Sequence, residues 1–97
     1  MLKKGGQVSY EQKEDTLVVH IGGEIDHHSA VSVRTGIDEK IASDRPARVL
    51  LELSKVDFMD SSGIGIALGR YKKLSKSGGR ICIAGCSTYI EKVLDMA

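Results

Sequence analysis

The first part of the chain has the period of two that is typical of β-strands. Residues 7–11 are expected to form a short strand, and the β-branched run 16–21 is expected to pair with it as a hairpin. The polar residues 13–15 form the predicted turn. The glycine pair 22–23 is expected to end the second strand.

The next segment changes to the period of a helix, because apolar residues recur at spacings of three and four. Asp26 or Ser29 is expected to cap the start of this helix, and residues 44–46 are expected to end it. The apolar residues of its buried face are Ala30, Val33, Ile37 and Ile41.

The second half of the chain repeats this alternation of strand and helix. The run 48–53 predicts a strand, and its nearly continuous apolar character favours a central position with both faces covered. A loop is expected over 55–60, then a helix that ends at the glycines 78–79, a strand over 80–84 and a last helix over 88–94. The expected buried stripe of the middle helix is Ile64, Ala67, Leu68, Tyr71 and Leu74.

This order of elements predicts an α/β fold. Strands that alternate with helices pair in parallel through right-handed crossovers, and the first strand adds an antiparallel edge. A chain of 97 residues has room for one domain. Because the last helix makes only a couple of turns before Ala97, we expect residues 1–97 to be a single domain without its final elements; a naturally short domain is the alternative.

Charge and composition exclude several classes of protein. The net charge is +1 and charged residues are spread along the chain, which argues against nucleic-acid binding. No apolar run approaches the ~20 residues of a membrane-spanning helix, and none follows the charged residues 1–6 as in a signal peptide. Cys82, inside the apolar run 81–84, is expected to be a buried, reduced thiol, which predicts a cytoplasmic protein.

The segment Asp60-Ser61-Ser62-Gly63 lies between a predicted strand and a predicted helix, at the sheet edge where α/β folds place their sites. Asp60 can cap the helix, and Ser61 then falls on the first turn with its hydroxyl near solvent. A phosphate there gains from free N–H groups and the helix dipole, while a partner meets up to two new negative charges. Since Asp and Ser are the commonest cap residues, the segment alone favours a simple cap.

Two neighbouring features favour an additional role. Glycine costs up to ~1 kcal/mol relative to alanine inside a helix, so close packing on the sheet or close approach of a partner must offset Gly63, Gly65 and Gly69. The preceding loop is expected to expose three apolar side chains, Val56, Phe58 and Met59.

These residues resemble a known family. The segments 58–65 and 68–72 resemble the signature of the anti-sigma factor antagonists, which have the STAS fold, and are most similar to its sporulation-type members. Residues 23–30 resemble the first loop of that family between strand and helix, and 78–80 also fit. The resemblance covers residues 7–96.

The resemblance implies a four- to five-stranded mixed sheet with helices packed against it, and a binding protein with no enzymatic activity and no cofactor. In this family the unphosphorylated protein binds an anti-sigma factor that is also a serine kinase, and so frees the sigma factor. The kinase phosphorylates the first serine of the motif, here Ser61, which ends binding until a serine phosphatase resets the switch. Family members usually continue for another strand and helix.

The resemblance also implies a set of partner-binding residues. Asp26 matches a family position that contributes to contact with the kinase. The full set comprises Asp26, Phe58, Met59, Asp60, Ser61, Ser62, Gly63 and Ile64. The residues themselves do not decide between Ser61 and Ser62, because both lie on the first helical turn.

Other functions have weaker support. The glycines 63, 65 and 69 resemble a dinucleotide fingerprint whose last glycine comes one place late, so nucleotide binding stays a weak alternative. A serine hydrolase is disfavoured because Ser61 and Ser62 lack the flanking glycines of a nucleophile elbow. A third possibility is a regulatory STAS module of a stress-signalling or transporter system.

The remaining chemically notable side chains are expected to be structural. His20, His27 and His28 have no ligand spacing that completes a metal site, and Cys82 and Cys86 are not a redox pair. A basic run, Arg70, Lys72 and Lys73, is expected on the exposed side of the middle helix, as a solvated face or as a contact for an acidic surface on the partner.

Overall fold

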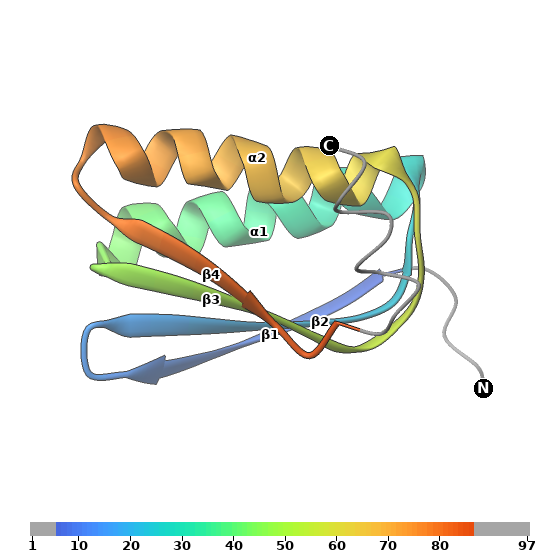
Figure 1. The fold of residues 1–97 in the computed structure, drawn as a ribbon, viewed down its shortest axis with the longest axis horizontal. Coiled ribbons are helices and arrows are strands. Elements are labelled where there is room, and N and C mark those ends of the chain that lie inside the picture. Colours follow the sequence, from blue (N-terminus) through green and yellow to red (C-terminus); the bar gives the residue numbers. More distant parts are fainter. Residues whose placement is uncertain (1–5, 87–97) are drawn as a thin grey trace.

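The computed structural model describes residues 6–86, which form one sheet with two helices on one of its faces (Figure 1). The predicted helix over 88–94 lies outside the described residues. The elements in chain order are β1 (Gly6–Lys13), β2 (Thr16–Ile25), α1 (His27–Asp44), β3 (Arg48–Met59), α2 (Ser61–Lys76) and β4 (Arg80–Ala84).

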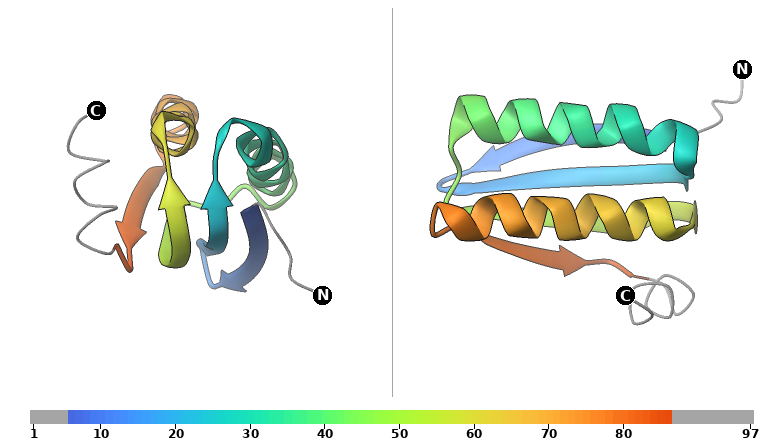
Figure 2. Two further views of the ribbon diagram at one scale, coloured as in Figure 1. Left: turned by 90° about the vertical axis from the view of Figure 1, so that its right-hand side faces the viewer. Right: turned by 90° about the horizontal axis from the view of Figure 1, so that it is seen from above.

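The four strands lie in the order β1-β2-β3-β4, with β1 antiparallel to β2 and the other two pairs parallel. The prediction of a mixed sheet with an antiparallel first strand is therefore confirmed. The two helices lie side by side in one layer, α1 against β1 and β2, and α2 against β3 and β4 (Figure 2). Neither is long and apolar enough to cross a membrane.

The core lies between the helix layer and the sheet. Its fully buried side chains are Leu17, Val19, Ile25, Val33, Ile37, Val49 and Leu51. In β3, Val49 and Leu51 are buried, Arg48 is exposed and Leu50 is half-buried. The prediction that this strand is covered on both faces was wrong for residues 6–86, because both helices pack on the same face and Leu50 points away from them.

Three strands are longer than predicted, and β1, expected over 7–11, spans Gly6–Lys13. β2 continues through Gly22 and Gly23, because both glycines pair with β1 on one side and with β3 on the other. A Cβ on Gly22 would lie 3.1 Å from Lys55 Cβ, so the missing side chain lets β3 approach closely. Residues 55–59 of the loop predicted over 55–60 are the end of β3, which pairs with β2 as far as Met59, and Asp60 alone lies outside the strand.

The predicted buried stripe of α2 is partly wrong. The side chains of Leu68 and Tyr71 are 49% and 56% exposed, and the buried positions are Gly63, Ile66, Arg70 and Leu74. The periodicity located the helix correctly, but its rotation follows from Gly63, which lies against the sheet. Cys82 was also predicted wrongly: it is exposed, because it lies on the strand that ends the described sheet.

Candidate functional site

The carboxyl ends of β2 and β3 bring two capping aspartates together. Ile25 and Met59, the last residues of these strands, are partners in the parallel register. The backbone N–H of Asp60 donates to the carbonyl of Ile25 at 3.2 Å. Asp26 and Asp60 therefore begin two neighbouring helices at the same edge of the sheet, on the right of Figure 1.

Asp26 caps α1 by a reciprocal capping box. Its Oδ1 accepts hydrogen bonds from the backbone N–H groups of His28 and Ser29, each at 3.0 Å, and Ser29 Oγ accepts from the N–H of Asp26 at 3.0 Å. Hydrogen bonding to the Ser29 N–H is the main cause that holds the pKa of Asp26 below its ordinary value. Because its pKa is lowered, the carboxylate of Asp26 stays charged. Because Asp26 is only half-buried, this charge is presented at the edge where α1 begins.

Asp60 caps α2, as predicted, with a single side-chain hydrogen bond and no reciprocal capping box. Its Oδ1 accepts from the Ser62 N–H at 2.8 Å, and its carbonyl accepts from the Gly63 N–H at 3.0 Å. Ser61 is the first residue of the helix and is exposed, and its hydroxyl makes no hydrogen bond with any residue in the range 6–86. Ser62 is half-buried, so the structure distinguishes the two serines by access where the sequence did not.

The three apolar residues before the cap do not form an exposed loop, and this prediction was wrong. Because β3 continues to Met59, Val56 and Met59 are buried, at 8% and 4% exposure. Phe58 alone points outward, with 42% of its surface exposed. The apolar part of the candidate surface therefore narrows to Phe58 and the half-buried Ile64 on α2.

The glycines of α2 lie in two different environments. A Cβ on Gly63 would overlap Met59 Cγ and would lie 2.6 Å from Met59 Sδ, so Gly63 serves close packing on the sheet. A Cβ on Gly65 or Gly69 would have nothing within 4 Å. These two positions leave open space along the outer side of α2, which suits close approach of another backbone.

The structure also contains an ion cluster that sequence reasoning missed. Arg70 was expected on an exposed basic face, but it is only 4% exposed and its Nε lies 2.9 Å from Asp38 Oδ1. These atoms form an ion pair whose geometry does not make a hydrogen bond. Lys73 Nζ lies 2.9 Å from the other oxygen of Asp38, so a single carboxylate of α1 holds two cations of α2.

Two of the three histidines lie at this site, and the third does not. His20 lies on β2, where its Nε2 is 3.3 Å from Glu11 Oε1, whereas His27 and His28 are exposed on the first turn of α1. Within the described range, no group of His, Cys, Asp and Glu side chains is arranged to hold a metal ion. The edge itself carries a charged cap, an exposed serine and a small apolar surface, a combination that suits recognition by another macromolecule.

Comparisons with known proteins agree with this architecture. The family model for the STAS domain matches residues 7–97. The chain is 36% identical over 91 residues to an anti-sigma F factor antagonist of Paenibacillus polymyxa. This match covers 94% of this chain and 78% of that protein. It is 32% identical over 91 residues to an anti-sigma-B factor antagonist of Bacillus subtilis (strain 168), covering 92% and 80%.

A solved structure of the anti-sigma factor antagonist SpoIIAA in its unphosphorylated form superposes with a TM-score of 0.83 at 30% identity, covering 93% of this chain and 79% of that chain. The predicted STAS-type sheet and helices are thereby confirmed. On the match of the family model across nearly its whole length, this chain belongs to the STAS domain family.

Proposed function

We propose that this chain is an anti-sigma factor antagonist of the sporulation type. Its unphosphorylated form binds an anti-sigma factor that is also a serine kinase, which releases the sigma factor, and phosphorylation of Ser61 ends the interaction. The observation that carries the proposal is the exposed Ser61 at the start of α2, next to the Asp26 cap of α1. The relatives named as antagonists of anti-sigma F and anti-sigma-B factors support the same class of function.

Phosphorylation at Ser61 would change the charge of this edge with little effect on the fold. The hydroxyl has no hydrogen bond to a described residue that the phosphate would break, and it lies at the positive end of α2. A phosphate adds up to two negative charges beside the carboxylates of Asp26 and Asp60. A partner whose surface complements two carboxylates and a neutral hydroxyl would therefore bind the phosphorylated form less tightly.

The proposed binding residues take two different roles in the structure. Asp26, Phe58, Ser61 and Ile64 reach the surface and are proposed to contact the partner. The others support these four from within the fold. These supporting residues are Met59, Asp60, Ser62 and Gly63.

The accompanying proposals concern how the switch operates. We propose that the chain acts in the cytoplasm without a cofactor or an activity of its own, and that a serine phosphatase restores the unphosphorylated form. Nucleotide binding by this chain has less support, because Gly63 is packed against Met59 and is unavailable to a phosphate group.

Mass spectrometry after incubation with the anti-sigma kinase and ATP tests the proposal. One added phosphate should map to Ser61, and Ser61→Ala should abolish it and keep partner binding after the incubation. Ser62→Ala is the matched control, and it should still be phosphorylated on Ser61. A phosphate on Ser62, or an unmodified wild-type chain beside an active kinase, would contradict the proposal.

A further inference from the structure

The outer side of α2 continues the candidate surface along the whole helix. Positions 61, 65, 68, 72 and 76 recur at intervals of three and four, so they share one helical face, and all five are exposed. The face begins at Ser61, has no side chain at Gly65, presents Leu68 and ends at two lysines. Lys72 lies about 16 Å from Ser61 at the usual rise of a helix.

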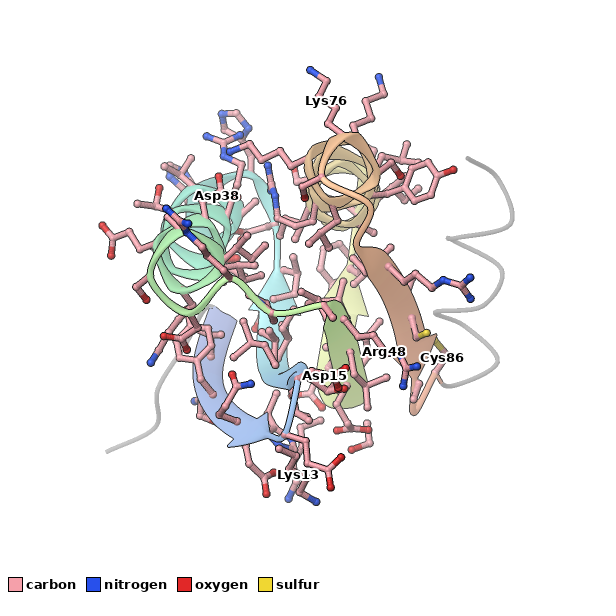
Figure 3. All side chains as sticks on the ribbon, turned by 90° about the vertical axis from the view of Figure 1, so that its left-hand side faces the viewer. Lys13, Asp15, Asp38, Arg48, Lys76 and Cys86 are labelled. Carbon is pink, nitrogen blue, oxygen red and sulfur yellow. The ribbon has the colours of Figure 1, made fainter. Side chains whose placement is uncertain are left out.

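The charge on α2 is of one sign. Its charged residues are Arg70, Lys72, Lys73 and Lys76, and it contains no Asp or Glu. Asp38 neutralises part of this charge through Arg70 and Lys73. Lys72 and Lys76 make no ion pair with any residue between 6 and 86, and Figure 3 shows Lys76 projecting from α2 away from the sheet.

The helix dipole explains only part of this arrangement. Cations are favourable in the last turn of a helix, which accounts for Lys73 and Lys76. Lys72 precedes that turn, and its positive charge adds to an excess that Asp38 alone does not balance. Such an excess of one sign on an exposed face attracts a partner of opposite charge.

We infer that Lys72 and Lys76, which we name the basic end of α2, bind an acidic segment of the same protein partner that recognises Ser61. The inference rests on the proposed function, because it extends that surface along the helix. Leu68 and the open space at Gly65 and Gly69 allow the partner to follow the helix from the serine to the lysines. Contacts of this exposed kind mainly accelerate association and weaken as the salt concentration rises.

The test measures the association rate and the affinity of the unphosphorylated chain for the anti-sigma factor over a range of salt concentrations. The double variant Lys72→Glu/Lys76→Glu should bind about five- to tenfold more weakly at low salt, with most of the loss in the association rate. The difference from wild type should shrink at high salt. Circular dichroism first establishes that each variant is folded.

The matched control is Lys13→Glu/Arg48→Glu, which changes the net charge equally. Both control residues are exposed on strands, and Figure 3 shows them away from the outer side of the helix layer. The inference predicts that this control binds like wild type. Equal losses in both double variants, or no loss in either, would overturn it.

Two further outcomes separate the inference from the proposed function. In the first, wild type binds DNA or anionic lipid vesicles, and Lys72→Glu/Lys76→Glu loses this binding but keeps its affinity for the anti-sigma factor. That result would overturn the inference that the basic end of α2 binds an acidic protein segment. A folded wild-type chain that does not bind the anti-sigma factor at all would refute the proposed function and with it this extension.

Discussion

Replacing Gly63 with alanine gives the sharpest test of how α2 packs on the sheet. Alanine is favoured over glycine in a helix by up to ~1 kcal/mol. At this position, however, the new methyl group would overlap Met59 Cγ, and Met59 is 4% exposed and has little room to move. Overpacking of this kind costs typically about 1–3 kcal/mol, so we expect the variant to be destabilised by up to about 2 kcal/mol.

Gly65→Ala is the matched control two residues further along the same helix. Its methyl group would have no neighbour within 4 Å, so only the gain in helix propensity remains. The free energies of unfolding of the two variants should therefore differ by about 1–3 kcal/mol, with Gly65→Ala the more stable.

Urea unfolding followed by circular dichroism measures this difference, and the chain has no tryptophan to serve as a fluorescent probe. For a domain of this size the gap corresponds to roughly 1 M in the midpoint of unfolding. The double variant Met59→Ala/Gly63→Ala should be no less stable than Met59→Ala alone, since the side chain that overlaps the new methyl group is gone. If Gly63→Ala stabilises the chain as much as Gly65→Ala does, the close packing against Met59 is refuted.

Two further predictions concern charged groups. Asp38→Asn leaves the buried Arg70 without its anion, so the free energy of unfolding measured in urea should fall by about 2–3 kcal/mol. Lys73→Ala should lower it by less than about 1 kcal/mol, because Lys73 is exposed. The lowered pKa of Asp26 means that its charged form contributes stability above its ordinary pKa, which is lost as the pH falls through the lowered value. Thermal unfolding below about pH 4 should therefore show a smaller loss for Asp26→Asn than for wild type; identical pH profiles would contradict this role of the cap.

Within residues 6–86 the sequence predicted the order of the elements well, because strand and helix periods differ and the caps are local. Asp60 could be assigned as a cap since the signal needs only the residues that follow it. The length of β2 was misjudged for the opposite reason. Gly22 and Gly23 disfavour a strand locally, and they are held in one by partners from β1 and β3, which lie far away in the sequence.

Burial on α2 could not be predicted from the sequence either. Periodicity fixes which residues share a face but not which face meets the sheet, and the buried face turned out to carry Gly63 and Ile66 in place of Leu68 and Tyr71. Arg70 looked exposed because an arginine is seldom buried alone. Its anion is Asp38, which lies 32 positions earlier on a different helix, and only the packing of α1 beside α2 brings them together.

The two junctions between strand and helix at the proposed binding edge are as short as one residue each. A single residue, Asp26 or Asp60, separates each strand from the helix that follows, and the Asp60 N–H to Ile25 carbonyl bond ties the two junctions to each other. In the divergence of such a chain, this edge can exchange its exposed side chains, such as Phe58, but cannot gain or lose a residue without shifting one helix against the other. New partner specificities would therefore arise here by substitution, while changes in length would accumulate at the opposite end of the sheet.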